Sequence, residues 1–324
     1  EATIEIENGK IEAIGGNGTN NHMGYKGAGI GSDNLKIIFK GGEVIAKKGN
    51  GDYRAKEIED IHGIITVHSG TFDPCSFGGE TSVDDGTFTN CTFNNVTING
   101  GTFTNCPISG DKAIINKGTI NNTDGSRITS DEIIINGGNI KITIPQRENG
   151  IGIHSIETKK LIIYGGNIFI EGQSFRNANG GYDSKGGNAI NATESVEIYG
   201  GTIYLLGGSG NPVGGYADPG LAINSPKIII GGGSLYAKCG SPWTVFPFDK
   251  SIIKNQNNND IYLGITPEIA NATDVSVDGV PYYISGNHPE GDNKLYLYMT
   301  GVKHTITVRT NDNKVTTYPA TYVP

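Results

Sequence analysis

The sequence predicts an all-β chain, with a right-handed parallel β-helix (solenoid) and then a small C-terminal antiparallel β domain. Glycine contributes 50 of the 324 residues, and charged residues contribute only 18%. This composition is typical of many short strands joined by tight turns. A strand–glycine–strand unit also recurs along the chain, and a small residue followed by Ile precedes most of its copies.

In the recurring unit, apolar residues alternate up to a Gly-Gly or Asn-Gly corner and resume their alternation after it. A period of two predicts a strand with one buried face. The corners at Gly137, Gly165, Gly200 and Gly231 lie 28, 35 and 31 residues apart, which suits one coil of a solenoid each. The six copies occupy residues 3–13, 35–46, 132–142, 160–170, 195–205 and 226–236.

A short third strand is predicted before most units, centred on Ile30, Ile153, Ile190 and Ile223. Three short parallel strands in each coil, with Ile stacked on Ile, would close the interior of a β-helix. The same glycine corners are also the best short signal for a β-hairpin, so a ladder of hairpins is the alternative. The third strand recurs in register, which favours the β-helix.

Residues 70–110 carry a tighter repeat in which Phe or Ile recurs at about every fifth residue. This spacing predicts a narrow coil with three five-residue sides, with Phe inside and Asn at the corners. Cys75, Cys91 and Cys106 lie 16 and 15 residues apart in this repeat. We expect them to form a stack of small buried side chains, and the alternative is a disulfide between adjacent coils.

The pattern changes at Asn255, where a polar run leads into longer alternating segments. The predicted domains are therefore a parallel β-helix over residues 1–254 and a C-terminal β domain over residues 255–324. The second domain would be a cap or β-sandwich-like, because an open last coil exposes an edge that can pair with other strands.

Charge and hydropathy exclude two classes of partner. The formal net charge is −8, whereas nucleic-acid binding needs a dense face of Lys and Arg. No segment approaches the roughly 18 apolar residues of a membrane span, so we expect no membrane span in this chain. Neutral sugars, cations and proteins remain possible. The partner we expect is a polysaccharide or cell-wall glycan, and we expect a monomer.

Most candidate binding residues lie in loop insertions at one corner of the predicted coils, over residues 15–27, 172–187 and 207–220, and residues 52–54 are a looser match to these loops. Stacked coils would bring these loops side by side. Tyr can stack on a sugar ring and hydrogen-bond its hydroxyls, while Lys and Arg can bind sugar carboxylates. The alternative is that each Tyr pins its own loop and the charges keep the surface solvated. The candidate ligand-binding residues are Tyr25, Lys26, Tyr53, Arg54, Arg176, Tyr182, Lys185 and Tyr216.

Two carboxylates follow these tyrosines at nearly equivalent positions, Asp183 and Asp218. Together with loop carbonyls they suit Ca²⁺, which binds several oxygen ligands in a flexible geometry. Solvated loop carboxylates are the alternative, because the chain lacks the regular acidic calcium-loop motif.

The Ile-x-Ile-x-Gly-Gly-x-Ile-x-Ile units and residues 27–32 resemble bacterial cell-surface carbohydrate-binding β-helix proteins of pectate-lyase-like architecture. The resemblance covers roughly residues 1–254 and rests on the texture of the repeat. It implies an extracellular or cell-surface location, binding of polysaccharide or acidic sugar, and a calcium site.

Pectin-cleaving hydrolases of similar fold carry Asn-Thr-Asp, Asp-Asp, Gly-His-Gly and Arg-Ile-Lys segments in that order. Here Asn122-Thr123-Asp124 matches the first, but Asp84-Asp85 precedes it, and His62 and Arg127 lie in incomplete, misplaced segments. We therefore favour non-catalytic carbohydrate binding over an enzyme. The alternatives are a polysaccharide lyase or glycoside hydrolase of pectin-like polymers, and a structural adhesin or stalk that binds a protein.

Overall fold

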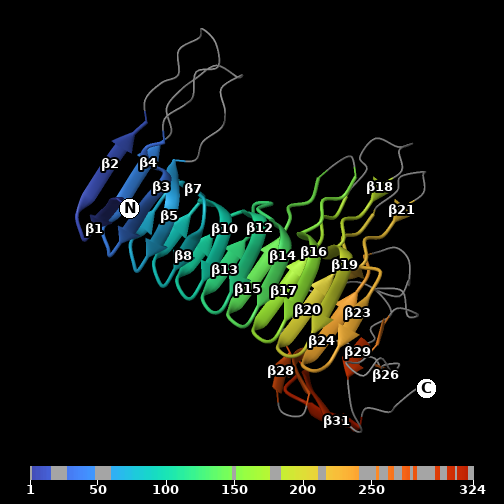
Figure 1. Cartoon of the computed structure of the whole chain (residues 1–324). Coiled ribbons are helices and arrows are strands. Elements are labelled where there is room, and N and C mark those ends of the chain that lie inside the picture. The colour runs from blue at the N-terminus through green and yellow to red at the C-terminus, as the bar shows by residue number, and fades with distance from the viewer. Residues whose placement is uncertain are drawn as a thin grey trace. The chain divides into compact units, whose positions relative to one another are not determined.

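The computed structural model is an all-β chain, and no helix occurs among the residues it describes (Figure 1). Most paired strands are parallel, and antiparallel pairs occur towards the C-terminus. The all-β prediction is therefore confirmed. The described residues are 2–15, 28–47, 60–147, 151–175, 184–210, 217–240, 253–254, 262–265, 272–277, 280–282, 296–299, 305–310 and 312–319.

The chain forms two compact units. The N-terminal unit comprises Glu1–Asn122 and Ser126–Ile133, and the C-terminal unit comprises Thr123–Gly125 and Ile134–Pro324. Strand β14 (Ile128–Ile135) contributes residues to both units. The predicted domain boundary after residue 254 stays a prediction.

In the N-terminal unit, the chain alternates between two parallel sheets. Each strand pairs with the strand one repeat away in sequence, and not with the strand that follows it around the glycine corner. The first sheet contains β1 (Ala2–Ile6), β3 (Ile30–Phe39), β5 (Ile61–Val67), β7 (Ser76–Gly78), β8 (Thr81–Val83), β10 (Thr92–Ile98) and β12 (Ile108–Ile115). The second contains β2 (Lys10–Ile14), β4 (Glu43–Lys47), β6 (Thr71–Phe72), β9 (Thr87–Thr89), β11 (Thr102–Thr104) and β13 (Thr119–Asn122).

This pairing decides between the two interpretations of the glycine corners. A hairpin would join β1 to β2 and β3 to β4 in antiparallel pairs, whereas β1 pairs with β3 and β2 with β4 in parallel. The hairpin alternative is therefore wrong.

The predicted short third strand belongs to the first sheet. In two repeats it is a strand of its own, since β7 precedes β8 and Ile223–Asn224 precedes Ile228–Ile230, and in the other described repeats it is joined to the alternating run. Ile190 and Ile223 do not form a separate wall, because they pair with each other inside the first sheet of the C-terminal unit. The register of that sheet shifts between the pairs Thr158–Ala192 and Lys160–Ser195, so the strand that carries Ile190 has one extra residue there. A bulge lets one strand carry both the short Ile segment and the alternating run.

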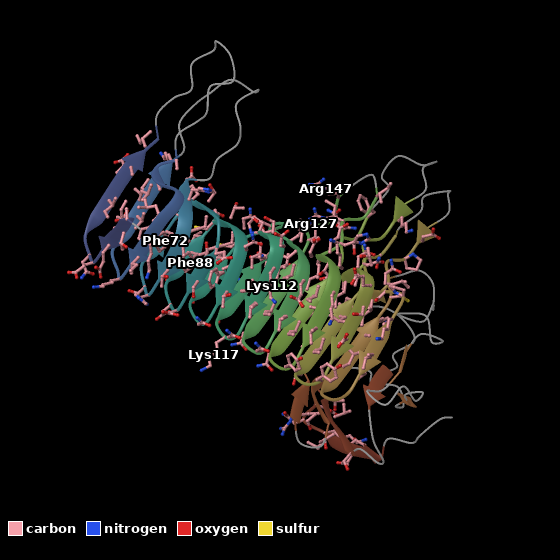
Figure 2. The ribbon with its side chains drawn as sticks, viewed as in Figure 1. Phe72, Phe88, Lys112, Lys117, Arg127 and Arg147 are labelled. Atoms are coloured by element: carbon pink, nitrogen blue, oxygen red, sulfur yellow. The ribbon has the colours of Figure 1, made fainter. Side chains whose placement is uncertain are left out.

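Phenylalanine rings fill the narrow repeats of the N-terminal unit, as predicted. Phe72, Phe88 and Phe103 are fully buried and stack face to face, with ring centroids 5.0 and 4.7 Å apart. Phe77 and Phe93 form a second stack at 4.7 Å, and the two stacks meet edge to face. Figure 2 shows Phe72 and Phe88 on neighbouring strands. The stacks follow from the parallel register, since Phe72 lies opposite Phe88 and Phe88 opposite Phe103.

Cysteine and asparagine complete the narrow repeats. Cys75, Cys91 and Cys106 are buried and form no disulfide, so the stack of small side chains is confirmed in place of the disulfide. Asn90 and Asn105 have φ of 53° and 54°, a left-handed conformation that Asn tolerates better than most residues. They mark the corners, as the sequence predicts.

The C-terminal unit also has two parallel sheets. The first contains β16 (Ile156–Ile163), β19 (Ile190–Ile198), β22 (Ile223–Asn224), β23 (Ile228–Ile230) and β25 (Ile253–Lys254). The second contains β15 (Asn139–Thr143), β17 (Asn167–Glu171), β20 (Thr202–Leu206) and β24 (Ser234–Lys238), and then the antiparallel strands β29 (Tyr296–Met299) and β26 (Tyr262–Ile265). Isoleucine dominates the buried positions of both sheets.

Two small sheets complete the C-terminal unit. A parallel pair joins β18 (Ser184–Lys185) to β21 (Ala217–Asp218). Antiparallel pairing orders β28 (Val280–Tyr282), β27 (Ala272–Val277), β30 (Thr305–Thr310) and β31 (Val315–Pro319) in one sheet. Strand β28 lies beside β20.

Polar side chains form a ladder along the glycine corner of the N-terminal unit. His68 Nδ1 donates to Asp84 Oδ2 at 2.7 Å, and Asn99 Nδ2 donates to Asp84 Oδ1 at 3.0 Å. Asn116 Nδ2 continues the ladder by donating to Asn99 Oδ1 at 2.7 Å. The hydrogen bond from Asn99, and then that from His68, lower the pKa of Asp84. Each rung thus depends on the next repeat being in register.

Replacing Phe88 by Ala tests the stacked core. Removal of a buried phenyl ring leaves a cavity and should lower the free energy of unfolding by about 3–5 kcal/mol. Urea unfolding followed by circular dichroism measures the loss. Thr87→Ala is the matched control, because Thr87 is the exposed neighbour on the same strand, and such changes stay within about 0.5 kcal/mol. Equal losses in both variants would contradict the stacked core.

Asp84→Asn tests the polar ladder through its pH dependence. A folded pKa below the unfolded one means that the carboxylate stabilises the fold at neutral pH, and that this contribution disappears as pH falls through the folded pKa. We expect a lower Tm for the variant than for the wild type at pH 7, with the difference shrinking towards pH 3. A difference in Tm that does not change with pH would show that the charge of Asp84 is immaterial.

Candidate functional site

The loop insertions of the C-terminal unit leave and re-enter the body at one corner. The chain leaves the second sheet after β17 and β20, and returns to the first sheet through the segments that begin at β18 and β21. Figure 1 shows β18 and β21 next to each other, in agreement with their parallel pairing. Two successive loops are therefore stacked at their bases, as the sequence predicts for insertions at a common corner.

Close-packed glycines form the base of these loops, and we call them the glycine neck. The leaving and returning segments alternate in it and hydrogen-bond directly to one another through their backbones. The bonds run from Gly187 N to Gln173 O, from Gly208 N to Gly187 O and from Gly220 N to Gly208 O, each at 2.8 Å, and from Gly240 N to Gly220 O at 3.0 Å.

The neck requires glycine because of close approach and not because of backbone conformation. A Cβ on Gly208 would lie 1.9 Å from the carbonyl oxygen of Gln173, and one on Gly220 would lie 2.0 Å from that of Gly187. Neither glycine is among those with a left-handed φ. Any side chain would therefore push the two segments apart. The sequence analysis placed these glycines inside the loops, whereas they close the solid base from which the loops project.

Buried amide side chains hold the returning segments one repeat apart. Gln173 is fully buried, accepts from Ile153 N at 3.2 Å and donates through Nε2 to Pro145 O at 2.9 Å. Asn188 Oδ1 accepts from Leu221 N at 2.8 Å. Buried amides with these bonds satisfied specify one register, because any slip would leave them without partners.

Above the neck, the returning segments present a short column of side chains. Parallel pairing places Lys185 opposite Asp218, and Ile151 forms a parallel bridge with Lys185. The backbone bonds continue this order, since Gly152 N donates to Lys185 O at 2.7 Å and Gly186 N donates to Asp218 O at 2.8 Å. All three side chains are exposed. A hydrophobic, a cationic and an anionic side chain thus follow one another at strand spacing, about 4.8 Å.

The structure brings together two of the ten predicted site residues, Lys185 and Asp218. The remaining eight lie outside the described residues: Tyr25, Lys26, Tyr53, Arg54, Arg176, Tyr182, Asp183 and Tyr216.

The sequence analysis missed Arg147 at this corner. Arg147 is exposed, lies in the short loop after β15 and forms a parallel bridge with Phe175, which follows β17 (Figure 2). It brings a second cation to the corner that carries Lys185. The loop that carries Arg147 is shorter than the three insertions singled out in the sequence, and its place at the same corner is the signal that could identify Arg147.

The described part of the predicted calcium site suits the ion poorly. Lys185 lies opposite Asp218 in the register. Its positive charge would repel a calcium ion bound to the Asp218 carboxylate and so weaken the binding of that ion. Among the described residues, no group of three or more His, Cys, Asp or Glu side chains could hold a metal ion. Asp183 lies outside the described residues, so the calcium site stays a prediction and no step below depends on it.

One carboxyl of this unit has an environment typical of a general acid. Burial raises the pKa of Glu171, and Lys141 opposes the shift. Its register neighbours in the second sheet are Thr143 and Leu206. Glycoside hydrolysis uses a pair of carboxyl groups, and neither neighbour supplies the second. This position gives no support to hydrolysis.

Comparison with protein families, with curated proteins and with solved structures gives no match. Within the described ranges, no helix is long and apolar enough to cross a membrane.

Gly208→Ala tests the glycine neck. The added methyl group would overlap the Gln173 carbonyl, so we expect a large loss of stability and faster proteolysis of the loops above the neck. Gly9→Ala is the control, because Gly9 has a φ of +106° but nothing within 4 Å of the added Cβ, and strain of that kind costs about 1–3 kcal/mol. Thermal unfolding and limited proteolysis measure both variants. A smaller effect at Gly208 than at Gly9 would show that the neck is not closely packed.

Proposed function

We propose that the chain is a right-handed parallel β-helix that binds carbohydrate without cleaving it, through the loop corner above the glycine neck. The observation that carries the proposal is the parallel pairing of β18 with β21, which stacks two loop bases in register. Stacked loops on a rigid support offer a repeating surface, and a polysaccharide is a repeating ligand.

The solenoid part of the proposal rests on the strand order. In each unit the chain alternates between two parallel sheets, and strands pair with those one repeat away. Crossover connections between parallel strands of one sheet are right-handed in about 98% of cases. A chain that winds repeatedly in this way forms a right-handed solenoid.

The loop corner has groups that recognise sugars. Arg147 and Lys185 are exposed cations on neighbouring repeats, and cations of this kind bind the carboxylates of acidic sugars. In the sequence, Tyr182 lies three residues before Lys185, and Tyr216 lies two before Asp218. Their rings would supply the apolar faces on which sugars stack.

The surroundings of Asn122, which begins the Asn-Thr-Asp segment shared with pectin-cleaving hydrolases, favour binding without catalysis. Asn122 is fully buried, where its Oδ1 accepts from Cys106 N at 2.8 Å and its Nδ2 donates to Cys106 O at 2.9 Å. Asn122 therefore joins two repeats and does not face a substrate. The proposal also includes a location outside the cell, which rests on the resemblance of the repeats.

Two sets of variants test the loop corner by retention on insoluble and acidic polysaccharides. Tyr182→Ala/Tyr216→Ala should lose most retention on the acidic polysaccharides that bind the wild type. Lys185→Ala should weaken binding to polygalacturonate by up to about fivefold, as expected for an exposed ion pair of about 0.2–1 kcal/mol. Lys117→Ala is the matched control, because Lys117 is an exposed lysine of the N-terminal unit (Figure 2).

Equal retention of the wild type and the tyrosine variant would refute the loop corner as the binding site. Unsaturated uronates or new reducing ends released during the incubation would refute the non-catalytic part of the proposal.

A further inference from the structure

A second surface of the C-terminal unit lies at its glycine corner, where the strands of the first sheet end. The residues that follow β16, β19 and β23 occupy successive rungs of one column. Tyr164 N donates to Ile135 O, Tyr199 N to Ile163 O and Gly231 N to Ile198 O, each at 2.7 Å. The column therefore presents two tyrosines and then a glycine.

The two tyrosine rings stack on each other at the surface. Their centroids are 5.5 Å apart and their planes differ by 19°, and Tyr164 is 52% exposed. Phe169 and Tyr204 form a comparable stack, but they are only 6% and 2% exposed. The buried stack is explained by packing alone. The exposed stack leaves aromatic surface in water, which is unfavourable unless a partner covers it.

A polar rim fixes the second ring of the pair. Tyr199 Oη donates to Glu197 Oε2 at 2.9 Å, and Ser195 Oγ donates to Glu197 Oε1 at 3.4 Å. Lys160 Nζ lies 3.7 Å from Glu197 Oε1. Burial, and then the bond to Glu197, raise the pKa of Tyr199, so its phenol keeps its proton at neutral pH. Since this proton is given to Glu197, the phenol oxygen can accept a hydrogen bond from a ligand.

Among the described residues, the column of side chains ends at Tyr199. Gly231 occupies the next rung and contributes no side chain to it. The ring face of Tyr199 that points along the column towards this rung therefore meets no side chain of the column. One rung is about 4.8 Å, a spacing at which a flat ring can stack as the next layer.

We propose that Tyr164, Tyr199 and Glu197 form a second carbohydrate site, separate from the loop corner, in which a neutral hexopyranose stacks on Tyr199 over Gly231. The sugar presents C–H groups to the ring and hydroxyl donors to Glu197 and to the phenol oxygen. A neutral sugar is preferred because the rim offers acceptors, and because Lys160, its cation, is already beside Glu197. A uronate would bring a second negative charge close to that carboxylate.

The test titrates cellohexaose and maltohexaose into the whole chain by isothermal titration calorimetry, with hexagalacturonate as the acidic comparison. We expect at least one neutral oligosaccharide to bind more tightly than the acidic one. Tyr199→Ala should weaken that binding at least tenfold, whereas Tyr164→Phe, which keeps the stack, should change it less than threefold.

Gly231→Tyr is the second variant, and it separates binding from folding. Gly231 is not among the glycines with a left-handed φ, and the equivalent rungs of the two preceding repeats carry Tyr164 and Tyr199, so we expect this rung to accept a tyrosine. The new ring would extend the stack and fill the rung, so we expect an unchanged or higher Tm and at least tenfold weaker binding. Tyr182→Ala/Tyr216→Ala should leave this binding unchanged, which separates the second site from the loop corner.

Each of three results would overturn the proposal. In the first, the wild type binds neither neutral oligosaccharide. In the second, Gly231→Tyr binds as tightly as the wild type, and in the third, Tyr182→Ala/Tyr216→Ala loses this binding.

Discussion

The structure depends on parallel, in-register pairing between strands one repeat apart. This pairing places equivalent residues of successive repeats on top of one another, so every side-chain type becomes a column. Phe72, Phe88 and Phe103 stack because their strands are in register, and the same constraint aligns Asp84 with Asn99 on the outside. A slip by one residue would turn the phenylalanines outward and the threonines beside them inward.

Much of this could be predicted from the sequence, since a column requires the same kind of residue at the same place in each repeat. The buried phenylalanines, the stack of cysteines and the asparagine corners follow from spacing, whereas the absence of a disulfide among the cysteines does not. The sheet to which the third strand belongs does not follow from spacing. Ile190 and Val196 lie in one strand because the chain bulges between their positions, and a bulge and a corner use similar short polar segments.

The position of the loop corner could be predicted from the sequence, but the pairing of residues within it could not. Insertions at equivalent positions indicate stacked loops, and β18 and β21 do pair. Sequence spacing pointed to Asp183 as the equivalent of Asp218, whereas the register puts Lys185 opposite Asp218. A register inside a loop depends on backbone contacts in its base. The close contact that excludes a side chain at Gly208 is made by the carbonyl oxygen of Gln173, 35 residues earlier in the chain. No local sequence pattern reveals this contact. Tyr164 and Tyr199 occupy ordinary positions of the repeat in the sequence, and only the structure shows that their rings stack and that Tyr164 is exposed.

Zero-length carbodiimide cross-linking of native lysines to carboxylates, with mass spectrometry, tests the in-register pairing most directly. In the structure Lys10 Nζ lies 2.9 Å from Glu43 Oε1, and Lys40 Nζ lies 3.2 Å from Glu7 Oε1. We predict cross-links between Lys10 and Glu43 and between Lys40 and Glu7, both of which join neighbouring repeats. Cross-links between Lys10 and Glu7 and between Lys40 and Glu43, without the first two, would mean hairpins and would contradict the account.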